Sequence, residues 1–295
     1  MKLTRRAVGY SIVIILLALI AYRLSKSWQE IDLTQFTLDP KYLVASFIAH
    51  AFGLALAAFG WALIIHRLER ESALLKSAKI YYYANVPKNV PGVFWYIIGR
   101  VYLHEKEGVA KTITTLAVAL ELILITLASS VVFMVCLLLQ PGSSVMDWRY
   151  ILLLLLGEAV LLHPTVFNKG INRLISLLNR QHEVQVALRF QDVFLWLVLY
   201  TAIISIGGGA LFLLVNAIYP ISLDRLPLIT KAWAISVIGS SLAFWFPANR
   251  GIRDGILVVA LNSFLPISAA VSSALLWRVW ITISEIFWAL VATRL

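Results

Sequence analysis

Long apolar runs, separated by short polar segments, organise the whole chain. A membrane-spanning α-helix needs about 20 predominantly apolar residues. Runs that suit such helices lie at about 7–24, 42–66, 111–139, 149–167, 192–217 and 269–292. The first of these six resembles a signal peptide, but no small-x-small cleavage site closes it, so we interpret it as a retained helix. The pattern predicts an all-α, polytopic integral membrane protein with one transmembrane domain over 1–295.

Two other apolar stretches are interrupted by helix-breaking residues. Pro87, Pro91 and Gly92 divide the stretch 80–103 into two short pieces, and the string FPANRGIRDG divides the stretch 228–265. Proline has no amide donor and ends a helix locally. Apolar pieces of about 10–14 residues suit re-entrant segments better than complete spans. We therefore predict a re-entrant helical hairpin in each stretch.

The positive charges predict how these elements are oriented. The net charge is +10. If each hairpin returns to the side of the membrane from which it enters, most Lys and Arg residues fall on one side of the membrane. Cytoplasmic loops carry an excess of Lys and Arg. This places both termini in the cytoplasm, at the plasma (inner) membrane, and makes the hairpins enter from opposite sides.

The stretch 168–191 has a different character from the spans. It carries apolar residues at helical spacing, punctuated by arginines. This pattern predicts an amphipathic helix that lies on the cytoplasmic interface. An ordinary cytoplasmic helical loop is the alternative.

The two interrupted stretches also resemble each other. The string PKN at 87–89 aligns with PAN at 247–249, and Glu121 in the following span corresponds to Glu285 in the last one. Chance similarity between two apolar segments is the alternative. Opposed repeats with broken helices are the construction of many secondary transporters, whose sites lie near the bilayer midplane. We therefore predict an inverted repeat.

The composition excludes a soluble domain, a disordered chain and a disulfide scaffold. Hydrophobic residues make up 61% of the chain and charged residues 14%, whereas soluble domains have about 45–50% apolar and about 25% charged residues. No basic segment is interleaved with exposed aromatics, which argues against nucleic-acid binding. The sequence contains no HExxH, GxxxxGK[ST] or GxSxG motif, and its histidines show no metal-ligand spacing. We therefore expect neither an enzyme nor a protein that holds a metal or cofactor.

Ionisable residues inside the predicted spans and hairpins are the candidate functional residues. Such residues are rare in membranes and by default indicate function. Arg278 and Glu285 are seven residues apart and share a helix face, and Glu121 could meet Arg100 from the first hairpin. Ion pairs that lock the helices together are the alternative interpretation.

The string NRGIRDG at 249–255 is the most informative motif. A helix is predicted to begin near Asp254, and its free amide groups, together with Arg250 and Arg253, suit an anion such as phosphate. The alternative is a turn in which Asp254 caps the helix while the arginines extend to water. All these candidates together predict one polar cavity, lined by Arg100, Glu121, Asn249, Arg250, Arg253, Asp254, Arg278 and Glu285.

Motifs in both hairpins and in the last span resemble a known family. They are Pro91-Gly92 with Gly99-Arg100-x-Tyr102-Leu103, Gly251-Ile-Arg253-Asp254-Gly255, and the helix with Arg278 and Glu285. From about 42 to 292 the chain resembles the transmembrane-region family of lysylphosphatidylglycerol synthases, a flippase-like domain. The resemblance implies movement of anionic or charged-headgroup lipids between leaflets. The string PANR replaces the family's usual Gly-Gly pair, and no soluble aminoacyl-transfer domain is present, so lysyl-lipid synthesis is not expected.

These observations lead to the hypothesis of a lipid flippase or transporter. The headgroup of a phospholipid or a polyprenyl-phosphate-linked lipid would cross through the polar cavity while its tails remain in hydrocarbon. That route avoids the cost of moving a charged group through the bilayer centre. The expected partners are membrane lipids, with a glycosyltransferase as a further candidate. The alternatives are a non-transporting membrane partner of a glycosyltransferase or lipid-modifying enzyme, and a secondary transporter for a small solute.

Overall fold

Four long helices dominate the described part of the chain. The computed structural model describes residues 38–70, 72–86, 95–139, 173, 188–243 and 249–294. Every regular element in these residues is helical. The helices that are long and apolar enough to cross a membrane are α2 (Pro40–Leu68), α5 (Lys111–Leu138), α8 (Phe190–Ile218) and α11 (Ile267–Ala292). They coincide with four of the six predicted spans, in agreement with a helical membrane protein.

The remaining span predictions fall outside the described residues. These are the spans at 7–24 and 149–167, together with most of the predicted interfacial helix at 168–191. The last two residues of that predicted helix belong to α8, which begins at Phe190.

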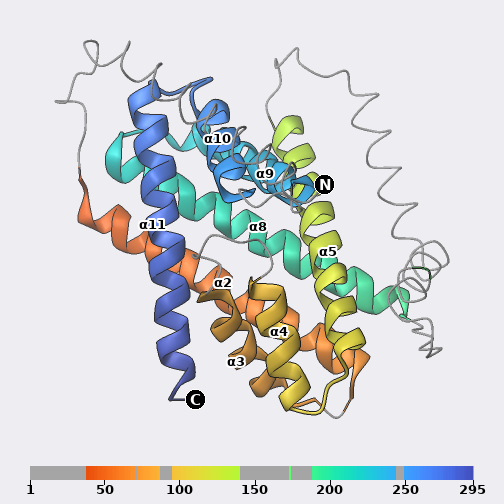
Figure 1. The fold of residues 1–295 in the computed structure, drawn as a ribbon. Coiled ribbons are helices and arrows are strands. Elements are labelled where there is room, and N and C mark those ends of the chain that lie inside the picture. Colours follow the sequence, from red (N-terminus) through yellow and green to blue (C-terminus); the bar gives the residue numbers. More distant parts are fainter. Residues whose placement is uncertain are drawn as a thin grey trace, which may run out of the picture.

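Helices α2 and α8 lie side by side and run in opposite directions (Figure 1). Near the end of α2, the side chain of Arg67 binds Asp192 in the first turn of α8, with 2.7 Å between Nε and Oδ2. At the start of α2, the amide of Asp39 donates to the carbonyl of Ala217 at 3.1 Å. We name these the Arg67 end and the Asp39 end of the bundle.

Local sequence determines where these two helices begin. The side chain of Asp39 accepts a hydrogen bond from the amide of Lys41 at 2.8 Å, and Pro40 takes the first helical position, where an amide has no partner to lose. In α8, the carboxylate of Asp192 accepts from the amide of Arg189 at 3.2 Å. Asp192 therefore both caps α8 and joins it to α2.

Each interrupted stretch forms a pair of short helices. The first pair is α3 (Leu74–Asn85) with α4 (Trp95–Lys106), and the second is α9 (Leu226–Leu242) with α10 (Asn249–Leu261). The two members of each pair pack against each other. The pairs span 74–106 and 226–261, in place of the predicted 80–103 and 228–265.

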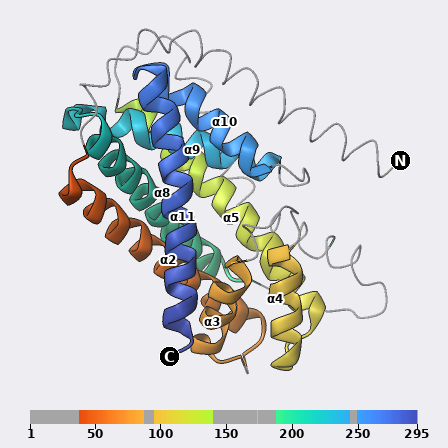
Figure 2. The ribbon, with the colours of Figure 1, turned by 60° about the vertical axis from the view of Figure 1, so that its left-hand side comes forward.

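The two helix pairs lie at opposite ends of α11 (Figures 1 and 2). Lys76 near the start of α3 binds Glu107 just after α4, with 2.7 Å between Nζ and Oε2. The first pair thus leaves from and returns to the Arg67 end, and Gly108, with a φ of +86°, makes the turn into α5. The second pair precedes α11, which runs back to the Arg67 end. Within the described residues, α2, α3, α4 and α5 follow the order long, short, short, long, and α8, α9, α10 and α11 repeat it. Helix α2 runs toward the Arg67 end, whereas α8 runs away from it.

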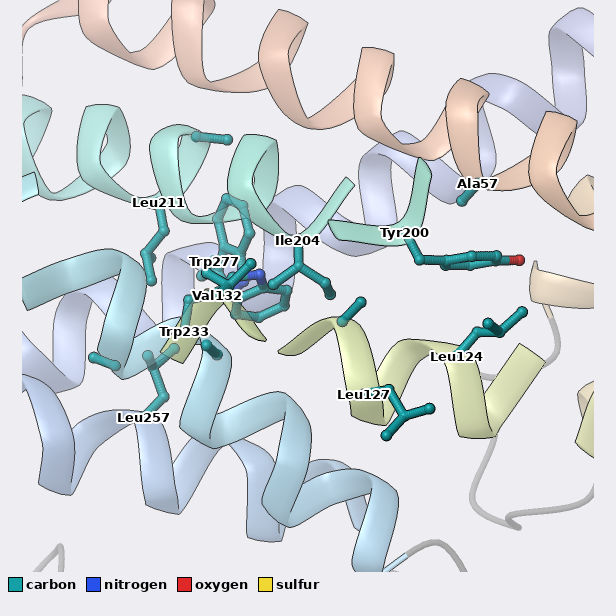
Figure 3. Close-up of a cluster of buried hydrophobic side chains, with 14 of the residues drawn as sticks. Ala57, Leu124, Leu127, Val132, Tyr200, Ile204, Leu211, Trp233, Leu257 and Trp277 are labelled. Carbon is teal, nitrogen blue, oxygen red and sulfur yellow. The ribbon is translucent and has the colours of Figure 1, made fainter. Parts of the chain in front are cut away.

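Aromatic and aliphatic side chains fill the space between the helices (Figure 3). Trp233 and Trp277 meet edge to face, with 5.4 Å between ring centroids. Tyr200 lies beside Leu124, and its hydroxyl points away from the tryptophan pair. The hydroxyl of Tyr200 therefore lies outside the contacts of the tryptophan pair and can form a hydrogen bond with a polar side chain.

A run of three glycines in α8 lets α9 approach closely. A Cβ added at Gly208 would lie 2.6 Å from Thr230, whereas one added at Gly209 would meet nothing within 4 Å. Gly208→Ala is therefore expected to destabilise the protein by about 1–3 kcal/mol through overpacking. Gly209→Ala, the matched control, should stabilise it by up to about 1 kcal/mol, because alanine favours the helix. Unfolding in detergent measures both, and equal effects would contradict this packing.

The contact between Lys76 and Glu107 should be visible in a titration. The hydrogen bond from Lys76 and its charge lower the pKa of Glu107 below its ordinary value. A carboxyl whose pKa is lowered by folding stabilises the protein above its unfolded pKa and loses this contribution as the pH falls through the folded pKa. Lys76→Gln is expected to return the pKa of Glu107 toward its ordinary value. Carboxyl-carbon NMR measures it, and an unchanged pKa would show that the pair does not form.

Candidate functional site

Arg100 and Glu121 form an ion pair in the interior, as the sequence predicts. Arg100 comes from the middle of α4 and Glu121 from α5, and the Nη1 group of Arg100 donates to Oε2 of Glu121. Their exposed fractions are only 1% and 3%. A buried pair of this kind holds only if further hydrogen bonds satisfy the remaining donors and acceptors.

Side chains from three other helices complete this group, which we name the Arg100 cluster. Tyr200 of α8 donates to Oε1 of Glu121 at 3.1 Å, and Asn85 of α3 accepts from Nη2 of Arg100 at 3.3 Å. The guanidinium carbon also lies 4.2 Å from the ring centroid of Trp61 of α2, at cation–π distance. Sequence reasoning missed these three residues. Of the three, only Asn85 could have been chosen as a candidate from the sequence, because it is a polar residue just before the proline break.

Asp254 forms a second group, which we name the Asp254 cluster, with two arginines. Its Oδ1 lies 3.1 Å from Nη2 of Arg253 on α10, and its Oδ2 lies 3.5 Å from Nη1 of Arg278 on α11. Two cations therefore share one carboxylate. The Arg278 side chain is 52% exposed and that of Asp254 is 17% exposed, so this cluster is much more open than the Arg100 cluster.

The position of Asp254 within its helix corrects one prediction. Helix α10 begins at Asn249, so Asp254 is its sixth residue and not a cap. Gly251 and Gly255 continue the helix without a positive φ. The backbone amides of Arg253 and Asp254 therefore lie inside the helix and are not among the free amides of a helix start. Of Asn249 and Arg250 only the backbone is described, so their predicted roles lie outside the described side chains.

Glu285 lies seven residues beyond Arg278 on α11. It is 5% exposed on α11, where it interacts electrostatically with Tyr81 of the first helix pair. Its neighbour Ser284 contacts His50 at 3.0 Å. Seven residues of helix separate Arg278 from Glu285 by about 10 Å along the axis, which carries Glu285 away from α10 and toward α3. Among the described contacts, Arg100 and Glu121 form one group and Arg253, Asp254 and Arg278 form another. A single cavity that also includes Glu285 stays a prediction.

In both helix pairs, the second short helix places a charged side chain against an opposite charge on the long helix that follows. Arg100 of α4 meets Glu121 of α5, and Asp254 of α10 meets Arg278 of α11. The short helix supplies the cation in the first ion pair and the anion in the second. The correspondence of Glu121 with Glu285 stays a prediction.

No protein-family model and no curated protein matches this chain. In the described part of the chain, no three His, Cys, Asp or Glu residues lie close enough to hold a metal ion. A function must therefore be inferred from the charged and polar side chains of the Arg100 cluster and the Asp254 cluster.

Proposed function

We propose that this protein moves a phospholipid or a polyprenyl-phosphate-linked lipid between membrane leaflets. The observation that carries the proposal is the Asp254 cluster, in which Arg253 and Arg278 share one carboxylate. Arginine binds phosphate with two parallel hydrogen bonds. A group with two cations and one anion retains a net positive charge, which suits the phosphate of a headgroup.

The surroundings of Arg278 favour a lipid as the ligand. Leu275 and Val279 on the same helix are exposed apolar residues, as expected where α11 faces hydrocarbon. A headgroup could reach Arg278 from this side while its tails remain in the bilayer. A small solute would instead require a site closed to the lipid phase. The resemblance of both hairpins to a flippase-like family supports the same function.

Charge supports the proposed orientation as well. Described basic residues at the Arg67 end are Arg67, Arg70, Lys76, Lys79, Lys106, Lys111, Arg189 and Arg294, whereas the side of the Asp39 end has Lys41, Arg225 and Lys231. Because cytoplasmic loops are rich in Lys and Arg, we place the Arg67 end in the cytoplasm of a plasma-membrane protein. The first helix pair then re-enters from the cytoplasm and the second from outside.

Leaflet exchange in vesicles tests the proposal. The purified protein is reconstituted with fluorescent phospholipids of different headgroups or with a polyprenyl-phosphate analogue, and protein-free vesicles serve as the control. Exchange should be faster than in the control and should depend on the headgroup. Folded protein that moves none of these lipids would contradict the proposal and favour the non-transporting partner of a lipid-modifying enzyme or glycosyltransferase.

A further inference from the structure

The two parts of α11 pack differently against the other helices. In its first part, 267–277, the buried residues are mostly small: Ser268, Ala269, Ala270, Val271, Ser273, Ala274 and Trp277. Small side chains let helices approach closely, and such contacts hold helices together within a bilayer. In its second part, 278–292, the buried residues are Ser284, Glu285 and Ala292. Close packing of small side chains therefore fixes the first part much more firmly than the second.

Polar and aromatic contacts join the second part of α11 to α2 and α3. Nδ1 of His50 and Oγ of Ser284 lie 3.0 Å apart, at hydrogen-bond distance. Nε1 of Trp288 donates to the carbonyl of Ala51 at 2.8 Å, and its ring stacks on Tyr82 with 5.1 Å between centroids. A hydrogen bond weakens steeply with distance and angle. The second part can therefore separate from α2 without disrupting the close packing of the first part.

Trp277 ends the first part, beside the proposed headgroup site. It is 0% exposed and meets Trp233 and His50 edge to face, with 5.4 and 4.9 Å between ring centroids. The next residue, Arg278, belongs to the Asp254 cluster, and the charge of Arg253 acts on His50. The contact between α2 and the second part of α11 thus adjoins the cations that we propose for phosphate binding.

We propose that the second part of α11 is a gate, which swings away from α2 about Trp277 when a lipid headgroup passes. This inference rests on the function proposed above and adds the element that moves. In the structure the gate is closed by the contact between His50 and Ser284. Opening would expose His50, Ser284 and Glu285 next to the Asp254 cluster. A headgroup held there would then gain a polar surface that leads toward the Arg67 end.

Cysteine labelling tests the movement without measuring lipid transport. Ser284→Cys and Ser273→Cys, each with Cys136→Ser, are reconstituted in vesicles and treated with a small, charged methanethiosulfonate. Both serines are 0% exposed, but Ser273 lies in the fixed first part. Because only the gate opens locally, Ser284→Cys should react roughly tenfold or more faster than Ser273→Cys. Equal rates overturn the proposal.

A reversible crosslink tests whether lipid movement needs the gate. His50→Cys/Ser284→Cys, with Cys136→Ser, places two thiols across the contact, so oxidation joins α2 to the gate. Leaflet exchange should fall roughly tenfold or more on oxidation and return on reduction. The control, Gly53→Cys/Ile206→Cys, joins α2 to α8, where a Cβ added at Gly53 lies 4.0 Å from Cβ of Ile206, within disulfide range. Its exchange should not change on oxidation.

Failure of the gate can be distinguished from failure of the proposed function. Exchange that survives complete oxidation of His50→Cys/Ser284→Cys overturns the gate. No exchange by wild type, together with faster labelling of Ser284→Cys, overturns the proposed function and leaves the movement of α11 supported.

A further variant covers the case in which the crosslink does not form. Trp288→Phe removes the donor to the carbonyl of Ala51. It should raise the labelling rate of Ser284→Cys by about twofold to tenfold, as expected for the loss of one hydrogen bond that holds the gate closed. An unchanged labelling rate would overturn the proposal.

Discussion

Replacing Arg100 by Met is expected to lower the free energy of unfolding by about 3–5 kcal/mol, because it leaves a buried carboxylate without its cation. Glu121 is 3% exposed and would keep only the hydrogen bond from Tyr200. That bond does not neutralise the charge. The rings of Trp61 and Tyr81 would also lose the guanidinium that lies 4.2 and 4.3 Å from their centroids.

The matched control for this variant removes both charges. Replacing a complete buried ion pair by apolar residues is often neutral or stabilising, so Arg100→Met/Glu121→Leu should regain most of the lost stability. Unfolding in detergent measures the three proteins together. A single variant as stable as wild type would contradict the buried ion pair between Arg100 and Glu121.

Replacing Arg253 by Gln is expected to slow lipid exchange roughly 10- to 100-fold, which corresponds to the loss of about 1.5–3 kcal/mol from a charge-assisted hydrogen bond to phosphate. The variant removes one of the two cations that share Asp254. Arg253→Lys should keep part of the rate, because lysine retains the charge but not the bidentate geometry.

Arg225 provides the control for this second prediction. It lies in the short 3-10 helix Leu223–Arg225 before α9, and its side chain is 48% exposed. Arg225→Gln removes the same charge outside the Asp254 cluster, so exchange should proceed at the wild-type rate. Leaflet exchange in vesicles is measured for all variants after their unfolding temperatures are shown to match. Equal rates for Arg253→Gln and Arg225→Gln would remove Arg253 from the site.

Hydropathy and proline placement determined most of the described helix framework. The predicted spans agree with α2, α5, α8 and α11 to within a few residues, and both interrupted stretches form helix pairs. These features are local, because the length of an apolar run and the position of a helix breaker are properties of neighbouring residues. The Arg100–Glu121 pair was also predictable, since both are charges within apolar sequence.

Only the tertiary structure decided which polar groups meet. Spacing along α11 places Arg278 and Glu285 on one face, but the crossing of neighbouring helices brings Asp254 to the first and Tyr81 toward the second. Tyr200 is indistinguishable in sequence from an ordinary aromatic of a span, and only the packing of α8 against α5 brings its hydroxyl to Glu121. Periodicity specifies the depth and face of a residue on its own helix, whereas its partner depends on where another helix lies in space.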